Sequence, residues 1–147
     1  EGQEIEILPT NQLGLEEIYY QKQPIHVPSA PSDAPLTKPL GQLFGARSGD
    51  KGGCANIGIW AKKESAFSFL NEFLTVEKLK ELMPDLAEFQ IDRYELPNIL
   101  SLNFYIHGIL QDGVSSNTRK DGQAKSLGEY LRAKYIEIPQ SLLEERI

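Results

Sequence analysis

Residues 89–106, FQIDRYELPNILSLNFYI, carry the clearest pattern in the chain. Two runs that favour extended structure flank Pro97-Asn98, a pair typical of turns, and together they predict an antiparallel hairpin. The second run alternates between apolar and polar side chains. One face carries Leu100, Leu102, Phe104 and Ile106, and the other carries Ser101, Asn103, Tyr105 and His107. We expect the apolar face to pack against helices and the polar face to stay available.

Upstream of the hairpin, the sequence predicts two strands and a broken helical region. The strands are expected in LGQLFGA (40–46) and IGIWA (57–61), with the glycine-rich segment 47–56 as the loop between them. Ser65 is a candidate N-cap of a first helix, and Thr75 is a candidate N-cap of a second helix. The apolar stripes are Ala66, Phe69, Leu70 and Phe73 in the first helix, and Val76, Leu79, Leu82 and Met83 in the second, before Pro84.

Downstream of the hairpin, a Gly/Ser/Asn-rich loop at 112–122 precedes a predicted helix, and YIEI (135–138) is a final strand ended by Pro139. The stripe of this helix consists of Ala124, Leu127, Tyr130 and Leu131. If the first strand is set aside, the order is βαββαβ, the split arrangement of ferredoxin-like folds. The predicted fold class is therefore α+β: a ferredoxin-like antiparallel sheet with an extra N-terminal strand and a proline-rich arm.

The N-terminal region has a different composition, because six of the nine prolines lie in the first 39 residues. Proline has no N–H to donate to a strand ladder and favours extended polyproline geometry. We therefore expect residues 1–39 to be an arm or linker and residues 40–147 to be the folded domain. Within the arm, EIEIL (4–8) alternates as a short strand would, and LGLEEIYY (13–20) suits a helical turn.

The arm also predicts assembly, because it carries more apolar side chains than a linker needs. These residues are Ile5, Ile7, Leu8, Leu13, Leu15, Ile18, Tyr19 and Tyr20. We expect at least a homodimer, with the arm on a second subunit or on a large partner domain. The alternative is an arm that folds back on its own domain. The chain begins with Glu1 and not Met, so we also expect a processed product or a segment of a longer protein.

Composition excludes several classes of protein. The chain of 147 residues suits one core, and 40% hydrophobic with 24% charged residues is typical of globular domains. A net charge of −6 argues against nucleic acid, and no apolar run is long enough to predict a membrane span, so the expected location is the cytoplasm. Cys54 is the single cysteine, and the histidines are His26 and His107. We expect no disulfide, no metal site and no cofactor.

The segment 47–56, RSGDKGGCAN, is the main candidate for chemistry. Its glycines allow backbone N–H groups to converge on a phosphate or carboxylate, and its cations add positive charge. The expected ligand-binding residues in it are Arg47, Ser48, Gly49, Asp50, Lys51, Gly52, Gly53 and Asn56. Asn103, His107 and Arg119 are expected to complete the site. The alternative is a plain connection with a solvated Asp50–Lys51 pair; the spacing is not that of a P-loop.

Catalytic residues are not identified with the same clarity, and the candidates are His107, Asp50 and Lys51. An imidazole titrates near neutral pH and suits acid–base work, although His107 has no identifiable partner acid. Arg119, Lys120, Asp121 and Lys125 open a predicted helix, where an anion or only solvent is expected. Cys54 is expected to be a small packing residue rather than a nucleophile. Asp92, Glu95 and Asp112 form no recognisable catalytic pair.

Four motifs carry a family resemblance: ARSGDKGGCANIGIWA (46–61), RYELPN (93–98), LNFYIHG (102–108) and RKDGQAKSLGEYL (119–131). From about Leu40 to Ile138 the chain resembles the small C-terminal ferredoxin-fold domain of AtuA-like acyclic terpene utilisation proteins. The family pattern has Asn where this chain has Cys54. The resemblance implies a domain fused behind, or encoded beside, a large utilisation domain that acts on acyl-CoA or terpenoid-acid intermediates.

Three hypotheses for function remain open. The leading one is a small accessory or binding domain of an AtuA-like acyclic terpene or acyl-CoA catabolic system, which binds an acyl-CoA or carboxylate anion and assembles with a large domain. The second is an enzyme of hydratase or lyase type with its site at segment 47–56, Asn103 and His107. The third is a purely structural oligomerisation module.

Overall fold

The predicted hairpin lies at one edge of the main sheet in the computed structural model, which describes residues 29–144. Strands β4 (Ile91–Leu96) and β5 (Ser101–Ile106) are antiparallel. The 3-10 turn η4 (Pro97–Ile99) joins them, and Leu100 closes it at φ 51 in the left-handed region. The hairpin prediction is confirmed, while the turn takes Leu100 out of the strand.

A second hairpin replaces the expected glycine-rich loop. Strand β2 (Gly45–Lys51) pairs with β3 (Cys54–Trp60), so segment 47–56 is mostly paired strand and only Gly52-Gly53 forms the turn. Gly52 has φ 66, which a glycine adopts without strain. The expected strand at 40–46 begins instead with the 3-10 turn η2 (Leu40–Gln42). The loop prediction was wrong for residues 47–51 and 54–56, which lie in paired strands and include Gly49, and right only for the turn at Gly52-Gly53.

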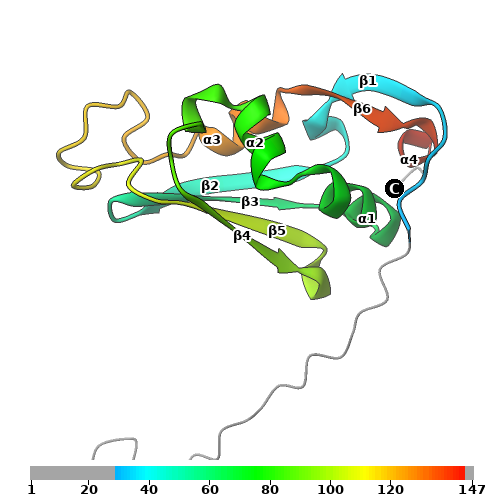
Figure 1. Ribbon diagram of the computed structural model, residues 1–147, viewed down its shortest axis with the longest axis horizontal. Coiled ribbons are helices and arrows are strands. Elements are labelled where there is room, and N and C mark those ends of the chain that lie inside the picture. Colours follow the sequence, from blue (N-terminus) through cyan, green and yellow to red (C-terminus); the bar gives the residue numbers. More distant parts are fainter. Residues whose placement is uncertain (1–28, 145–147) are drawn as a thin grey trace, which may run out of the picture.

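The main sheet has four strands in the order β2-β3-β5-β4 (Figure 1). A second sheet pairs β1 (Pro35–Pro39) with β6 (Tyr135–Pro139). In a βαββαβ sheet the last strand lies beside the first, but here β2 occupies that place beside β3 and β6 pairs with β1. The α+β, ferredoxin-like class is confirmed, with this one difference in strand arrangement.

The folded domain begins before the expected boundary at residue 40, because residues 35–39 form β1. Prolines are tolerated there since β1 has a partner on one side only. The expected strand at 4–8 and the helical turn at 13–20 lie outside the described residues. The expected contact of the arm with a second subunit therefore stays a prediction.

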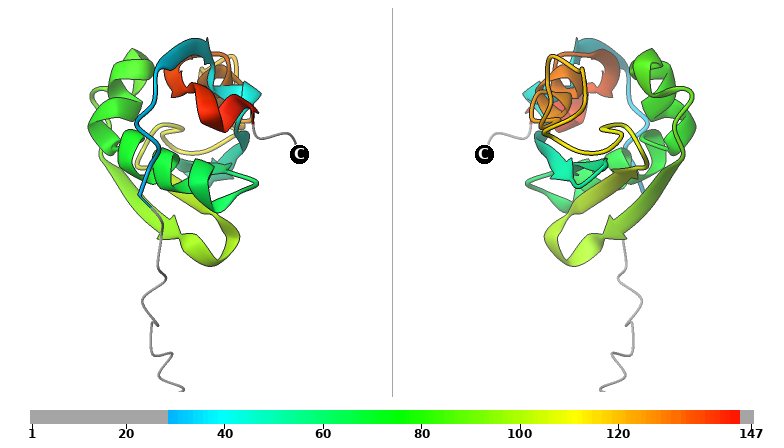
Figure 2. Two further views of the ribbon diagram at one scale, coloured as in Figure 1. Left: turned by 90° about the vertical axis from the view of Figure 1, so that its right-hand side faces the viewer. Right: turned by 90° about the vertical axis from the view of Figure 1, so that its left-hand side faces the viewer.

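Helices cover one face of the main sheet and leave the other uncovered by any element of residues 29–144 (Figures 1 and 2). They are α1 (Glu64–Phe73), α2 (Val76–Leu82), α3 (Leu127–Arg132) and α4 (Gln140–Glu144), with the 3-10 turn η3 (Pro84–Leu86). None of these helices is long and apolar enough to cross a membrane.

The helix caps and stripes agree in part with prediction. Thr75 caps α2 by accepting a hydrogen bond from the Lys78 N–H at 3.1 Å, whereas α1 is capped at Lys63 and not at Ser65. In α1, Phe67 is buried and Phe69 only half-buried, because the helix also packs on its Phe67 side. Tyr130 is 44% exposed, so it is not part of the α3 core stripe.

The core lies between the helices and the inward face of β3 and β5. Leu102, Phe104 and Ile106 are completely buried there, as are Ile57 and Ile59 of β3. The predicted faces of β5 are therefore confirmed: the apolar face packs under the helices, and Asn103 and Tyr105 lie on the uncovered face, half-buried. Burial of these branched and aromatic side chains is the main favourable term in folding.

Truncation of Phe104 should test this core. Phe104→Ala removes a fully buried ring from the central pair of strands, so we expect a loss of about 3–5 kcal/mol in the free energy of unfolding, measured by urea denaturation. The matched variant Ile99→Ala truncates a side chain that is 65% exposed, and it should change stability by less than about 0.5 kcal/mol. A loss under about 1 kcal/mol for Phe104→Ala would mean that the faces are reversed.

Candidate functional site

Two surfaces gather the residues that carry chemistry. The first is the open face, the face of the main sheet opposite the helices, and the second is a cleft along the outer edge of β2. The open face is defined by strand register, because residues paired across an antiparallel ladder share a face. Asn56 pairs with Tyr105, and Gly58 pairs with Asn103.

Asn56 and Asn103 are joined directly on the open face. The Asn56 Nδ2 donates to the Asn103 Oδ1 at 2.8 Å, across neighbouring strands β3 and β5. Both residues were expected at the site, and the structure brings them together. Their amides satisfy one another, so this pair is part of the sheet's own polar network.

His107 has a partner acid that sequence reasoning missed. Its Nε2 lies 2.7 Å from the Asp92 Oδ2, and both side chains are 39% exposed. The hydrogen bond from His107 holds the pKa of Asp92 below its ordinary value. The signal was present in the hairpin register, since Asp92 pairs with Tyr105 and His107 is therefore its diagonal neighbour.

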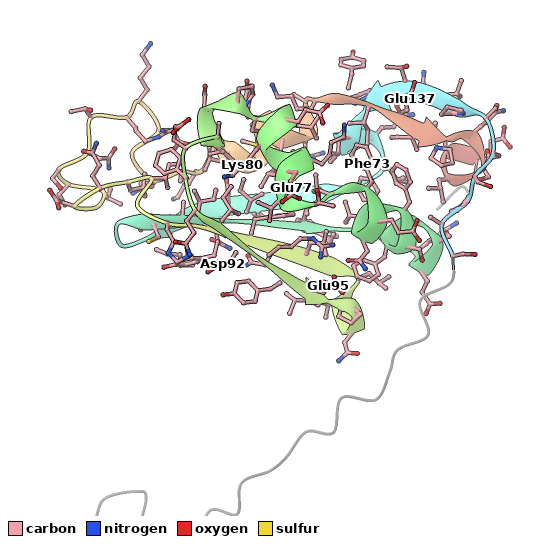
Figure 3. All side chains as sticks on the ribbon, viewed as in Figure 1. Phe73, Glu77, Lys80, Asp92, Glu95 and Glu137 are labelled. Carbon is pink, nitrogen blue, oxygen red and sulfur yellow. The ribbon has the colours of Figure 1, made fainter. Side chains whose placement is uncertain are left out.

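Asp92 occupies the end of β4 away from the η4 turn, and Glu95 the other end (Figure 3). Glu95 forms a separate ion pair, in which its carboxylate accepts a hydrogen bond from Arg93 at 2.6 Å. Arg93 also donates to the carbonyl oxygens of Leu74 and Asn71, so it ties β4 to the α1–α2 region. Asp92 alone of the β4 carboxylates is therefore available to His107.

Cys54 belongs to the same cluster. Its Sγ accepts a hydrogen bond from the Gly108 N–H at 3.4 Å, and the ring of Tyr105 stands edge-on to that of His107 with centroids 4.9 Å apart. The hydrogen bond from the Tyr105 hydroxyl, followed by that from Gly108, lowers the pKa of the Cys54 thiol. The same interaction raises the pKa of Tyr105. Cys54 is half-buried and accepts one backbone hydrogen bond, and its expected role as a small packing residue stays a prediction.

The residues of segment 47–56 are divided between the two faces of the sheet. Asp50 pairs with Ala55 on the helix-covered face, opposite the face that carries His107. Lys51 donates from its Nζ to the Asp50 carbonyl oxygen at 2.9 Å. The three catalytic candidates therefore do not converge on one point, because alternate residues of a strand face opposite ways.

The Gly52-Gly53 turn is packed against the chain that follows β5. The Gly53 carbonyl accepts from the Leu110 N–H at 2.9 Å, and a Cβ on Gly53 would lie 2.1 Å from the Gln111 carbonyl oxygen. Glycine is required at position 53 for this close approach. The Gly53 side of the turn is thus packed against residues 110–111, whereas a Cβ on Gly52 would meet nothing within 4 Å, and the expected anion cradle stays a prediction.

Ser48 fastens α3 to β2. Its hydroxyl donates to the Lys125 carbonyl oxygen at 3.0 Å and accepts from the Gly128 N–H at 2.9 Å. Gly128 allows this contact, because a Cβ there would come within 3.2 Å of the Arg47 backbone. Asp121 caps the same region by accepting hydrogen bonds from the Lys125 and Ser126 N–H groups.

Arg119 lies in the loop between β5 and α3, where its N–H donates to the Asn117 Oδ1 at 3.1 Å. Burial acts to raise the pKa of Asp121, but hydrogen bonds from Ser126 and Lys125, with a smaller contribution from the Arg119 guanidinium, hold it below its ordinary value. The predicted cluster around Arg119 therefore builds the entry to α3.

The edge of β2 next to α3 contains the second surface, which we call the β2 cleft. Two adjoining hollows of about 410 and 330 Å³ share Ala46, Arg47 and Glu129. The first also includes Trp60, Lys62 and Arg132, and the second includes Ser48 and Lys125. Four cations therefore surround one carboxylate. Sequence reasoning identified Arg47 but missed Lys62 and Arg132, since only the docking of α3 on β2 brings them near.

Arg132 is incompletely satisfied in the β2 cleft. Its Nη1 lies 3.1 Å from the Glu129 Oε2 and its Nη2 donates to the Gly41 carbonyl oxygen at 3.5 Å. The Nε atom is buried with no hydrogen-bond partner among the described residues. A buried N–H without an acceptor is costly. For metal ions, residues 29–144 contain no group of three His, Cys, Asp or Glu side chains.

These features define an α+β domain with one covered sheet face and one open face. Residues 38–137, about two thirds of the chain, match the AtuA ferredoxin-like domain, and the protein belongs to this family. No curated protein and no solved structure matches the chain.

The reactivity of Cys54 should follow the pKa argument. Because Tyr105 lowers the pKa of the thiol, the rate of alkylation by iodoacetamide should rise at a lower pH than for an unperturbed cysteine, whose pKa is about 8.5. Tyr105→Phe removes the hydroxyl and should move the midpoint to higher pH. Tyr94→Phe removes an exposed hydroxyl from the same face and should leave the midpoint unchanged. Equal midpoints in all three proteins would contradict the assignment; no second cysteine complicates the measurement.

Proposed function

We propose that this domain is a small accessory module of an AtuA-type acyclic terpene or acyl-CoA catabolic system, and that it binds the anionic part of an acyl-CoA or carboxylate ligand in the β2 cleft. The observation that carries the proposal is the set of cations around that cleft. Arg47, Lys62, Lys125 and Arg132 surround Glu129 in a chain whose net charge is −6. Local positive charge on an acidic protein favours a specific anion over general phosphate binding.

The chemistry of the lining supports an anion with an apolar portion. Arg132 has a buried Nε that lacks an acceptor among the described residues, and arginine suits carboxylate and phosphate recognition because its donors are fixed in a planar fork. Trp60 lines the same hollow and is 37% exposed, so it offers aromatic surface. A volume of about 410 Å³ falls within the range of small-molecule sites.

The enzymatic alternative has less support. Its proposed groups are already paired with one another: Asn103 with Asn56, and His107 with Asp92. They also lie on an exposed sheet face, whereas acid–base catalysis gains from a site that excludes water. The domain is therefore proposed to bind and present a ligand, while the chemical step takes place in a larger partner.

The family supports a partner of that kind. Membership of the AtuA ferredoxin-like domain family, together with the resemblance to utilisation proteins, implies a large AtuA-type domain fused to or encoded beside this one. We propose that the two assemble in the cytoplasm and that the domain delivers the acyl-CoA or terpenoid acid to the large domain.

Calorimetric titration with octanoyl-CoA, and separately with octanoate, tests the binding site. Lys62→Gln and Lys125→Gln each remove one charge from the β2 cleft without removing a buried group, and each should weaken binding about five-fold, corresponding to about 1 kcal/mol. Lys120→Gln removes the same charge from the exposed loop before α3 and should leave the Kd unchanged.

Higher salt should weaken binding to the wild type because the contact is ionic. Absence of binding at millimolar ligand, or equal losses in Lys120→Gln and the cleft variants, would overturn the proposal. Binding of octanoyl-CoA but not octanoate would assign the phosphates, and not the carboxylate, as the recognised group.

A further inference from the structure

The open face has the composition of a contact surface. Trp60 of β3 is 37% exposed, and Tyr94 and Leu96 of β4 are 51% and 43% exposed. Tyr94 and Leu96 are neighbours on the same face of β4, and exposed apolar side chains that adjoin in this way mark contact surfaces more often than ones scattered singly. The face is also bare of any helix or loop of residues 29–144 (Figure 2).

We propose that the open face is the interface of a homodimer, in which a second copy stacks face to face about a twofold axis parallel to the strands. The proposal goes beyond the ligand-binding function, and the two share Arg47 and Trp60, which line the β2 cleft and also lie on the open face. Under this symmetry β2 lies over the β4 of the partner, and β3 over its β5, because the strand order is β2-β3-β5-β4. A row is a set of residues paired across the four strands. In this arrangement each row faces the same row of the partner, with the strand order reversed.

The row that contains Gly58 is complementary to itself in this arrangement. It runs across the sheet from Arg47 through Gly58 and Asn103 to Tyr94. Arg47 faces the partner's Tyr94, a favourable cation–π arrangement. Gly58 faces the partner's Asn103, so the side chain from one sheet enters space that the other leaves empty. Facing sheets pack about 10 Å apart, which makes this matching of small and large necessary.

The neighbouring row toward the Gly52-Gly53 turn supplies matching charge. It runs from Gly49 through Asn56 and Tyr105 to Asp92. The partner's Asp92 therefore faces Gly49, between the two cations Arg47 and Lys51 on the same face of β2. The negative charge on β4 and the positive charges on β2 therefore favour an arrangement in which β4 of one subunit lies over β2 of the other.

The row at the other end is apolar. Trp60 pairs with Gly45, and its ring lies on that glycine, since a Cβ there would be 2.3 Å from the indole Cε2. Leu96 stands at the far side of the same row, beyond Ser101. The Trp60 ring thus faces the partner's Leu96. A large aromatic side chain of one subunit again lies opposite a smaller residue of the other.

The competing arrangement, with the axis perpendicular to the strands, lacks these matches. It would place β2 on the β2 of the partner, so that Arg47 and Lys51 meet like charges, and β4 on β4, so that Tyr94 collides with its own copy. The glycines of β2 would face one another across a void. Like-charge contact and poor packing both cost affinity.

Covering the open face leaves few polar groups without partners. Asn56 is bonded to Asn103, His107 to Asp92, and the Cys54 Sγ to the Gly108 N–H. Buried polar groups that retain hydrogen bonds cost far less than orphaned ones. The internal pairing that argues against catalysis on this face therefore suits its burial in an interface.

Gly58→Arg tests the interface with the full-length chain by size-exclusion chromatography with light scattering. A Cβ at Gly58 has its nearest neighbour at 3.8 Å, so the monomer accommodates a side chain, whereas the dimer would have to enclose a charged one between its sheets. The wild type should have twice the monomer mass of 16.5 kDa, and Gly58→Arg should weaken dimerisation at least 100-fold. Gln123→Arg adds the same charge to an exposed loop and should remain dimeric. Circular dichroism reports whether each variant is folded.

A charge exchange tests the direction of the axis. Arg47→Glu and Tyr94→Arg should each weaken the dimer about ten-fold, the first by placing a carboxylate beside the partner's Asp92 and the second by facing two guanidinium groups. The double variant should recover most of the loss, because the carboxylate introduced at position 47 then faces the guanidinium introduced at position 94 of the other subunit. Only an axis parallel to the strands brings positions 47 and 94 together.

Three outcomes would overturn the proposal: a wild type that is monomeric at 100 μM, a Gly58→Arg variant that stays dimeric, or single charge variants whose losses add without recovery. A monomer that binds only a large AtuA-type domain would make that domain the occupant of the face. The two proposals can fail separately: Lys62→Gln lies outside the paired rows of the open face, so it should weaken binding of octanoyl-CoA and stay dimeric.

Discussion

A four-stranded sheet has two faces, and residues 29–144 provide helices for only one of them. Apolar and polar residues alternate along the central strands. The apolar ones buried beneath α1 and α2 include Ile57, Ile59, Leu102 and Phe104. The residues between them therefore lie on the opposite face of the sheet, which these helices do not cover. The proposed interface depends on this asymmetry, because the open face exists only where the helical layer stops.

Close backbone approach shapes the second surface. Gly128 lets α3 lie directly on β2, and the Ser48 hydroxyl holds it there from both sides through Lys125 and Gly128. The helix in turn delivers Glu129 and Arg132 to the β2 edge. A cleft with several cations is therefore a consequence of one small residue in a helix and one hydroxyl in a strand, both of which also stabilise the fold.

The glycines of segment 47–56 show how one residue type can be misinterpreted from sequence. Glycine favours turns, and three of them beside two cations indicate an anion-binding loop. In the structure Gly49 lies within a strand and Gly53 is required by the nearby Gln111 backbone. Gly49 pairs with Asn56 of β3 in a local hairpin, whereas the contact at Gly53 joins residues more than fifty positions apart and is not visible in local pattern.

Local pattern alone determined the β4–β5 hairpin, the two faces of β5, the Thr75 cap and the α+β class, because alternation, turn dipeptides and capping residues act over a few neighbouring positions. Family motifs added the identity of the domain. Tertiary structure decided that β6 leaves the main sheet for β1, that His107 meets Asp92, that Tyr105 bonds Cys54, and that Lys62 and Arg132 share a cleft. These outcomes depend on which distant segments pack together, and that choice follows from the whole core and not from any single stretch of the chain.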